Sequence, residues 1–543
     1  MLFYVLLRVA AAIAAYVGLA FLLALVSTVD PAQILTTIPQ QPRALDPPLA
    51  SKLASILAGQ FGVSRFDHQP VSSLIAKSLG ATIGTACVAA LIASVIALPL
   101  GIAAGRIRGS IGDTALLRIT LLLEAPPIFW VALLLVVLGV QLGLLPASAA
   151  QGGAGLVIPV LAFAAAIVPI LMRRTRQGVA ELAASEGGAS GGRILIICVS
   201  ALLAGLLAAI GWAVAAEPIL DSAGAGRLLY QAIVQRDVPL FSGALMTLGA
   251  AAIAIALISD VLRAAAGLGG HRQGFSHELA HHGETEGAPR LASVGFILGA
   301  FLLLALVGLS FLADDPNQLN LTARLRPVAS PEHLLGTDVL GRDVLARACV
   351  ALRWSIGLGL LVAALATVLG AVLGTIGTLS SFTATLIRVL IEARFSLPLL
   401  LVAVAVVSVF QPGLLPIAAV LGLGLSDGPA AATLTARYPL PARAIQHQPP
   451  PAPNGFVKLT GPWLAAFFHS AASAIVLFET TNFLGLAIAP PTATFGGMLE
   501  TAARFASTNP GLTYVPGLIL VALVLSLLLM ADGLRSTSAR GRR

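Results

Sequence analysis

The sequence predicts an all-α protein that crosses a membrane many times. Of its 543 residues, 57% are apolar and only 10% are charged, which leaves too little polar surface for a water-soluble globule. The chain is long enough for about a dozen membrane helices of roughly 20 residues each, with their loops. Its three cysteines, Cys87, Cys198 and Cys349, lie in or beside apolar segments without paired spacing. They are interpreted as buried small side chains and predict neither a disulfide framework nor a metal site.

Apolar runs mark twelve candidate spans. The first run, Leu2 to Val26, carries only Arg8 and lacks a convincing cleavage site, so it predicts a retained helix and not a signal peptide. Two of the later runs are short for a span and have soft boundaries. The twelve runs lie near residues 2–27, 76–105, 116–142, 155–172, 194–216, 241–262, 291–313, 355–380, 384–409, 413–425, 463–478 and 516–531.

The charge distribution predicts the orientation of the chain. With residue 1 inside, twelve spans place most of the 32 lysines and arginines on the cytoplasmic side, as the positive-inside tendency favours. Both termini are then cytoplasmic. The net charge of +8 follows from this topology and indicates no nucleic-acid partner, because the basic residues are dispersed over loops.

The twelve runs form two sets of six with the same layout of long and short loops. Between the sets, residues 267–290 are rich in glycine, histidine and charge and lack a sustained apolar face. Such a composition predicts a flexible cytoplasmic linker. The sequence therefore predicts a first half over residues 1–266 and a second half over residues 291–543.

A dense polar motif, LGTDVLGRD, occupies residues 335–343 outside any apolar run. Gly336 permits a tight turn, and Thr337 or Asp338 can cap a helix on which later apolar residues recur at helical spacing. This pattern predicts an interfacial amphipathic helix with Asp338 and Arg342 one turn apart on its polar side. The structural alternative is a loop that anchors the external end of the next span. The functional interpretation is a docking surface or gate for a substrate-binding protein.

Motifs in both halves carry a family resemblance. They lie at residues 59–64, 70–71, 126–130, 142–148 and 226–239 in the first half, and at 315–316, 335–343, 482–486, 497–499 and 516–518 in the second. In order and spacing these motifs resemble the dipeptide/oligopeptide/nickel ABC importer permease family, B-type in the first half and C-type in the second. The resemblance implies a type I ABC importer permease in which two six-helix membrane subunits are fused in one chain.

The resemblance also implies the function and the partners. The chain would be a transport subunit without catalytic residues in the bacterial cytoplasmic (inner) membrane, importing peptides that an extracytoplasmic substrate-binding protein delivers. Two ABC ATPase subunits, or one fused ATPase, would bind ATP and Mg on the cytoplasmic side, and this chain would hold no cofactor. The alternative within transport is an importer of nickel, metal chelates or other small solutes. The implied docking residues are Gly62, Ser64, Gly336, Thr337, Asp338, Gly341, Arg342 and Asp343.

Two cytoplasmic loops depart from that family, whose permeases dock a short Glu-Ala-Ala helix into each ATPase. Residues 181–193 are a degraded copy in which glycines replace basic residues and lower helix propensity by about 1 kcal/mol each. Residues 437–458 contain a cluster of prolines that precludes a long helix. We hypothesise asymmetric coupling, and the alternative is that both loops dock through backbone shape alone. The candidate coupling residues are Glu181, Ala184, Gly188, Ser190, Arg193, Arg437 and Arg443.

Other chemistries fit the sequence less well. A P-loop needs a lysine after glycine, and none of Lys52, Lys77 and Lys458 follows one, so the chain is not its own ATPase. The run HELAH at residues 277–281 matches the zinc-protease pattern, but its glycine-flanked setting favours adventitious metal binding over catalysis. The alternatives from other classes are an ATP-independent secondary transporter and a membrane zinc metalloprotease.

Charged and aromatic residues within spans are candidates for the transport path, because charge in hydrocarbon faces protein or water. The first carboxylate, Glu124, precedes a pair of prolines at 126–127 that would break its helix beside the path. Its bland interpretation is a partner on another helix or a position at the cytoplasmic end. The second carboxylate, Glu392, lies one helical turn from Arg388, and this spacing favours mutual neutralisation of the two charges. The four candidates are Glu124, Phe129, Trp130 and Glu392.

Overall fold

A computed structural model describes most of the chain. The described residues are 2–26, 48–144, 155–183, 190–264, 289–311, 315–394, 396–410, 413–430, 433, 457–505 and 508–538. Within these ranges the regular secondary structure is helical, with three isolated antiparallel bridges in loops. The chain is an all-α polytopic membrane protein, as its composition predicted.

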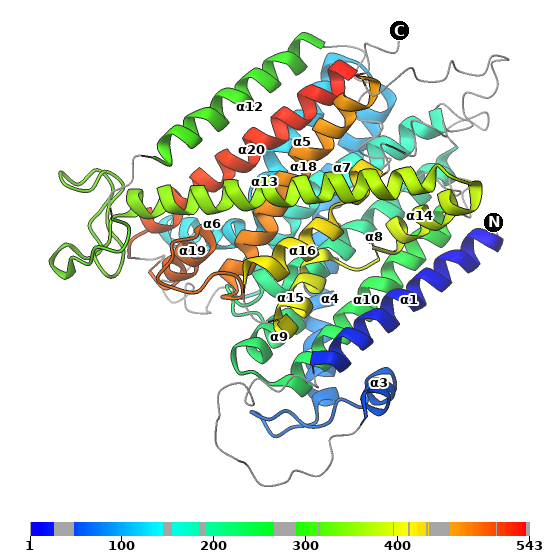
Figure 1. The fold of residues 1–543 in the computed structure, drawn as a ribbon, viewed down its shortest axis with the longest axis horizontal. Coiled ribbons are helices and arrows are strands. Elements are labelled where there is room, and N and C mark those ends of the chain that lie inside the picture. Colours follow the sequence, from blue (N-terminus) through cyan, green and yellow to red (C-terminus); the bar gives the residue numbers. More distant parts are fainter. Residues whose placement is uncertain are drawn as a thin grey trace.

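The helices of the first half run from α1 to α10 (Figure 1). They are α1 (Leu2–Val26), α3 (Leu49–Leu57), α4 (Val71–Arg106), α5 (Ile111–Glu124), α6 (Ile128–Gln141), α7 (Val157–Ala183), α8 (Gly191–Ala216), α9 (Ala225–Val234) and α10 (Val238–Arg263). The second half contains α12 (Pro289–Leu309), α13 (Val344–Gly377), α14 (Ser381–Arg394), α15 (Leu399–Phe410), α16 (Leu414–Gly424), α18 (Val457–Phe483), α19 (Phe495–Ala503) and α20 (Gly511–Ser538), with a 3₁₀ turn over Leu321–Ala323.

Every predicted apolar run contains a helix, but the runs do not form twelve full-length spans. In the described part of the chain, eight helices are long and apolar enough to cross a membrane, or nine if α5 and α6 together form one bent span. The remaining runs correspond to shorter apolar helices over Ser293–Leu309, Phe382–Ile391 and Leu414–Ala430. Within the described residues, the eight long helices, the bent pair and the three shorter helices together account for all twelve predicted runs.

Prolines account for two of these differences. The run near 116–142 is split into α5 and α6, which meet at an angle of 82°, and the run near 384–409 is split into α14 and α15. Pro127 precedes α6, and Pro398 precedes α15. A proline ring lacks the N–H that would continue the preceding helix, so each predicted span ends there and a new helix starts.

Small residues allow close helix packing at matching places in the two halves. A Cβ atom at Gly101 of α4 would lie 2.8 Å from Thr175 Cβ of α7, and one at Gly374 of α13 would lie 2.5 Å from Thr433 Cβ. Glycines at such contacts let helix backbones approach closely in a membrane. Each half therefore brings its longest helix, α4 or α13, against a threonine on a later segment.

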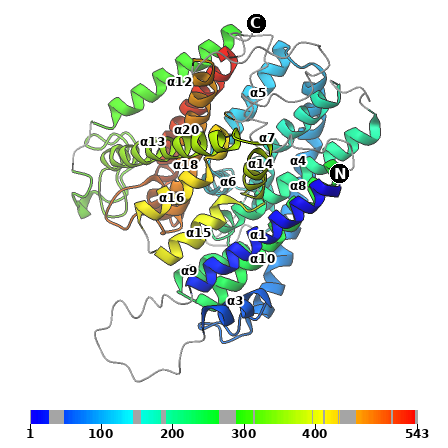
Figure 2. The same cartoon turned by 45° about the vertical axis from the view of Figure 1, so that its right-hand side comes forward.

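The two halves are placed side by side with their first helices at opposite edges. In both views α1 lies beside α10 and α12 lies beside α20 (Figures 1 and 2), and these are extensive helix contacts. The halves meet where α1 contacts α14 and α15, where α8 and α10 contact α15, and where α5 and α6 contact α20. The largest buried apolar cluster of the described chain extends across this boundary.

Candidate translocation path

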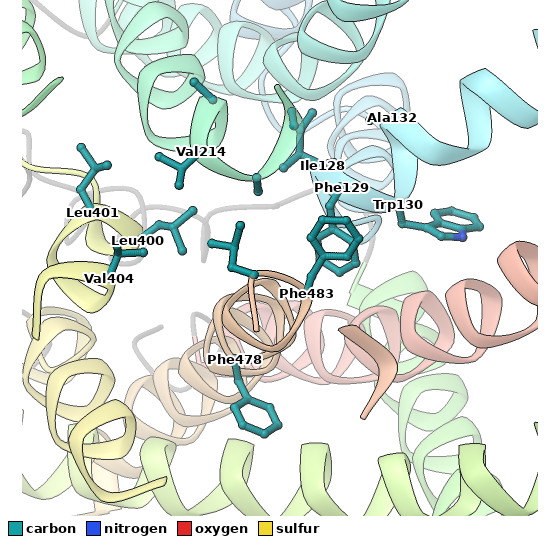
Figure 3. Packing of buried hydrophobic residues seen from close by; sticks show 14 of the residues in the cluster. Ile128, Phe129, Trp130, Ala132, Val214, Leu400, Leu401, Val404, Phe478 and Phe483 are labelled. Carbon is teal, nitrogen blue, oxygen red and sulfur yellow. The ribbon is translucent and has the colours of Figure 1, made fainter. Parts of the chain in front are cut away.

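The halves meet in a buried apolar seam between α6 and α18. Phe129 and Phe483 stack with ring centroids 5.0 Å apart and an interplanar angle of 23°, and both side chains are buried. Figure 3 shows these two rings face to face, with Val214 and Leu400 from neighbouring helices beside the same region. The stacked rings therefore form a buried apolar contact between the two halves.

The next residue of α6, Trp130, packs against α20 of the second half. Its Nε1 atom donates a hydrogen bond of 3.0 Å to the Thr513 carbonyl oxygen. Gly517 lies against the indole ring, where a Cβ atom would come within 1.6 Å of Trp130 Nε1. At the far end of α6, Tyr514 Oη donates to Gln141 Oε1 at 2.7 Å. Two of the four predicted path candidates, Phe129 and Trp130, thus lie at the boundary between the halves.

Of the other two path candidates, the structure describes the side chain of one. Glu124 forms an ion pair with Arg173 of α7, which confirms the bland interpretation of a partner on another helix. Arg173 is 10% exposed and Glu124 is 30% exposed, so the pair is neutralised within the first half. Glu392 belongs to α14, but its side chain lies outside the described part of the structure.

A buried carboxylate at the end of α8 joins three helices of the first half. Glu217 Oε1 accepts a hydrogen bond of 2.7 Å from Thr82 Oγ1 on α4. Its Oε2 accepts from the backbone N–H groups of Gly226 and Arg227 in the first turn of α9, at 2.8 and 3.1 Å. Thr82 Oγ1 also accepts from Ala225 N at 2.8 Å. We call this group the α9 clamp.

Glycines make the α9 clamp possible. A Cβ atom at Gly224 would come within 2.2 Å of the Glu217 carboxylate oxygens, and one at Gly226 within 2.3 Å of the Ala213 carbonyl carbon. Burial raises the pKa of Glu217, which lies just beyond the α8 span, to about 7, and the hydrogen bonds from Thr82, Arg227 and Gly226 oppose that rise. The carboxylate therefore depends on these donors to compensate for the loss of water.

The second half repeats the same arrangement. Glu479 near the end of α18 accepts a hydrogen bond of 2.5 Å from Ser355 Oγ on α13 and one of 2.7 Å from Gly496 N in the first turn of α19. A Cβ atom at Gly496 would lie 2.1 Å from the Glu479 carbonyl oxygen. We call this group the α19 clamp. Gly101 lies 19 residues after Thr82, and Gly374 lies 19 residues after Ser355. The glycine of the close helix contact is therefore the same number of residues from the clamp hydroxyl in both halves.

The sequence analysis missed both clamps, although a signal was present. Glu217 directly follows the predicted run 194–216, and Glu479 directly follows the predicted run 463–478. A carboxylate placed at the same end of corresponding apolar runs marks a repeated position. The two runs occupy the same place in their sets of six, so the pair could have been recognised by comparing the halves.

The loop that precedes α4 is fastened to the start of α10. Asp237 caps α10 by accepting from Leu240 N at 3.1 Å. Its other carboxylate oxygen accepts from Ser64 Oγ at 2.6 Å and from Arg65 N at 2.8 Å. Ser64 is buried, and Gly62 has a φ of +80°, which favours glycine. These two predicted docking residues therefore shape the loop, with Ser64 turned inward.

The motif at residues 335–343 is not an amphipathic helix, so that prediction is wrong. Helix α13 starts at Val344, and its cap is Asp343, which accepts from Ala346 N at 2.9 Å. The motif forms a compact turn because Gly336 and Gly341 adopt φ values of +79° and +73°, which a right-handed helix does not contain. The structural alternative, a loop that anchors the external end of the next span, describes it better.

Asp338 holds that turn together from inside. Its Oδ1 accepts from Leu340 N at 2.8 Å and Arg342 N at 3.0 Å, and its Oδ2 accepts from Arg342 Nε at 2.7 Å. Arg347 Nε lies 3.6 Å from the same Oδ2. Thr337 is fully buried and its hydroxyl accepts from Arg326 N at 2.9 Å. The predicted pairing of Asp338 with Arg342 is confirmed, but it occurs in a turn.

The structure describes only part of the predicted coupling set. Glu181 in the last turn of α7 accepts from Gln177 Nε2 at 3.2 Å. Ser190 precedes α8 without a side-chain cap bond, and Arg193 lies in its first turn. Residues 184, 188, 437 and 443, and the HELAH run at 277–281, lie outside the described residues. Among the residues that are described, no group of three or more His, Cys, Asp or Glu side chains is arranged to hold a metal ion.

The sequence of this chain is similar to those of known membrane transport proteins. A family model described as "Binding-protein-dependent transport system inner membrane component" matches residues 97–266. The chain is similar to the dipeptide transport system permease protein DppC of Haemophilus influenzae, with 31% identity over 263 residues, covering 44% of this chain and 88% of the relative. It is also similar to the di/tripeptide transport system permease protein DppC of Pseudomonas aeruginosa, with 33% identity over 214 residues, covering 37% of this chain and 70% of the relative. A third relative, the probable D,D-dipeptide transport system permease protein DdpC of Escherichia coli, is 27% identical over 260 residues, covering 46% of this chain and 87% of the relative.

Proposed function

Because this chain belongs to the family of binding-protein-dependent inner membrane transport components, we propose that it forms the whole membrane path of an ATP-driven peptide importer. The observation that carries the proposal is the share of each chain that the similarity covers. The Haemophilus influenzae relative is matched over 88% of its length by only 44% of this chain. The remaining half is therefore large enough to be the second permease unit.

The repeated contacts support the fusion of two permeases. Each half contains a carboxylate clamp, a glycine packed against a threonine, and a span broken before a proline. The first half would be residues 1–266, the linker 267–290 and the second half 291–543. The substrate would pass between the halves, along the seam that Phe129 and Phe483 close, as the two halves move relative to each other.

The proposal includes partners on both sides of the cytoplasmic (inner) membrane. Two ABC ATPase subunits, or one fused ATPase, bind ATP and Mg inside, and a substrate-binding protein docks outside on the loops around Ser64 and residues 335–343. Both termini are cytoplasmic. Peptides are the proposed substrates because the printed names of the relatives refer to dipeptide and tripeptide transport. Asymmetric coupling through residues 181–193 and 437–458 remains a hypothesis for the ATPase side.

Uptake into vesicles tests the proposal. The full chain is reconstituted with an ABC ATPase and a substrate-binding protein from the same organism, and radiolabelled dialanine is the probe. We expect uptake that requires ATP and the binding protein and that persists when a protonophore removes the proton gradient. Uptake driven by a proton gradient without ATP would instead assign the chain to the secondary transporters.

The fusion makes a separate prediction about the linker. A protease site inserted between residues 267 and 290 is cleaved after the full chain has been placed in vesicles. We expect ATP-dependent uptake to continue and the two fragments to purify together, because the seam and the contacts of Trp130 with α20 hold the halves. A site of the same sequence inserted after residue 538 is the control. Loss of uptake on linker cleavage alone, or separation of the fragments, would contradict two self-contained halves.

A further inference from the structure

Each half contains a run that is broken before a proline, and an ion pair lies at each break. In the first half, Glu124 at the end of α5 pairs with Arg173 of α7. In the second half, Arg394 Nη2 at the end of α14 lies 3.9 Å from Oδ2 of Asp427, which follows α16. The two pairs therefore occupy matching places, with the acid before the break in one half and the base before the break in the other.

The two pairs also share one pattern of burial. Glu124 and Arg394, the members at the breaks, are 30% and 26% exposed, whereas their partners Arg173 and Asp427 are 10% and 7% exposed. A buried charge that loses its partner is strongly destabilising, because its lost hydration is then not compensated. Each pair therefore holds the end of the helix before the break against a buried charge of the same half.

Further contacts fix the helix before each break to its own half. Asp113 near the start of α5 is fully buried, and its Oδ2 accepts a hydrogen bond of 2.6 Å from Arg176 Nη2 of α7. Helix α5 is thus held on α7 toward both of its ends. In the second half, Arg394 Nε donates to the carbonyl oxygen of Gly424 at the end of α16. Both helices before the breaks are therefore anchored within their own halves.

The segments after the breaks are seated on the opposite half. Trp130 of α6 lies against Gly517 of α20, with the hydrogen bond and close contact described above. Pro398, which precedes α15, lies against Gly211 of α8, where a Cβ atom would come within 2.6 Å of the Pro398 Cβ atom. In both places a ring from one half fits a glycine on a long helix of the other. Each broken run thus connects the two halves.

We propose that the two ion pairs are positioning pairs that fix the angle at each break and thereby seat the following segment on the opposite half. We call Glu124–Arg173 and Arg394–Asp427 the break pairs. Because the second half carries its charges in the reverse order, the attraction within each pair is what matters, and the order of the charges does not. The inference rests on the proposed function only for its effect on uptake. The angle itself is a property of this chain and can be measured without partners.

Distances between spin labels test the angle at the first break. Labels at Ile111 and Leu142, both 70% exposed, mark the far ends of α5 and α6 in a full chain whose three cysteines have been replaced. The labelled chain is studied in lipid vesicles without ATPase, binding protein or substrate. We expect one narrow distance distribution, and a roughly twofold broader one in Glu124→Gln and Glu124→Arg, because local opening at the break becomes easier. Glu124→Arg combined with Arg173→Glu should be narrow again, since it reproduces the charge order of the second half.

A second pair of labels tests the seating of α6 on the other half. Gln141 Oε1 accepts a hydrogen bond from Tyr514 Oη, so the end of α6 lies beside the start of α20. Labels at Leu142 and Thr508, both exposed, therefore report the position of α6 on α20. This distribution should broaden and recover in the same variants as the first.

The second break is tested in the same way. Labels at Phe382 and Leu415, 74% and 83% exposed, lie on either side of the α14–α15 break. Arg394→Glu should broaden their distance distribution, and the addition of Asp427→Arg should restore it. Recovery in both halves would show that each pair acts through the attraction of its charges.

An exposed ion pair supplies the control. Glu500 and Arg504 are 35% and 73% exposed, and pairs of this kind contribute little to stability. Glu500→Arg changes the charge by the same amount as Glu124→Arg and should leave all three distributions narrow. Unchanged widths in both Glu124→Arg and Arg394→Glu would overturn the proposal. A failure of both exchanged pairs to restore the widths would do so too, as would equal broadening by Glu500→Arg.

Uptake of radiolabelled dialanine separates the break pairs from the proposed function. Glu124→Arg should lower the maximal uptake rate several-fold while the concentration of binding protein at half-maximal uptake stays unchanged, and the addition of Arg173→Glu should restore the rate. Distances that depend on the break pairs, without uptake by the unaltered chain, would reject the proposed function and retain the pairs. Normal uptake by Glu124→Arg, despite a broad distribution, would reject their role in transport.

Discussion

Gly517→Ala is expected to weaken the association of the two halves severely. The added methyl carbon would lie 1.6 Å from Trp130 Nε1 and 2.2 Å from Trp130 Cδ1, and the indole is buried and held by its bond to Thr513. Overpacking of a buried site costs typically about 1–3 kcal/mol and occasionally more. Alanine is the better helix former, so a loss of stability would come from the clash. We expect a lower temperature of aggregation for the detergent-solubilised chain and loss of uptake.

Two comparisons make the Gly517 result specific. Gly357→Ala places a methyl group on α13 where no atom lies within 4 Å, so this variant should behave like the unaltered chain. Trp130→Leu combined with Gly517→Ala should recover part of the stability, because the smaller side chain vacates the space. Equal thermal stability of the Gly517 and Gly357 variants would mean that α6 and α20 are not packed as described.

Asp338→Ala is expected to unfold the external loop of the second half. The side chain is 10% exposed and accepts three hydrogen bonds within the turn. Its removal leaves two guanidinium groups, those of Arg342 and Arg347, at 12% and 9% exposure without this carboxylate. Breaking a buried ion pair by removing one partner costs about 3–5 kcal/mol. We expect rapid proteolysis within residues 319–343 in vesicles oriented so that the added protease reaches this loop. We also expect loss of uptake.

The nearby pair of Arg326 and Glu332 is the natural control for Asp338. These side chains are 39% and 72% exposed and 3.2 Å apart, and exposed pairs contribute about 0–1 kcal/mol. Glu332→Ala should therefore leave the loop resistant to protease. Replacing Asp338 and Arg342 together by alanine should cost less than the sum of the two single changes. Similar proteolysis of the Glu332 and Asp338 variants would show that the buried network does not hold the turn.

Sequence reasoning was most successful for features that depend on neighbours along the chain. Apolar runs located the long helices, since burying a helix in lipid requires continuous apolar surface. The prolines at 126–127 were also predicted to break the helix of the run 116–142, and α5 and α6 meet there at 82°. Sequence reasoning was less successful where a turn competes with helical spacing. At 335–343 helical spacing was assigned to a segment in which Gly336 and Gly341 adopt positive φ.

The candidate site could be predicted in part for the same reason. Phe129 and Trp130 belong to the motif at 126–130 that carries the family resemblance, and both lie at the boundary between the halves. Glu124 was singled out as a charge without a local partner, and Arg173 pairs with it from 49 residues away. Neither the partner nor the stacking of Phe129 on Phe483 can be inferred from one segment, since both depend on how distant helices pack.

By itself, the sequence determined that this protein lives in a membrane, consists of helices, and repeats one layout twice. Those properties follow from composition and local patterns, which act within a few residues. Only the tertiary structure decided that Glu217 and Glu479 serve as equivalent clamps and that α6 fits against α20. A buried polar group must find its donors in space, and the chain brings those donors from segments as far apart as Thr82 and Glu217.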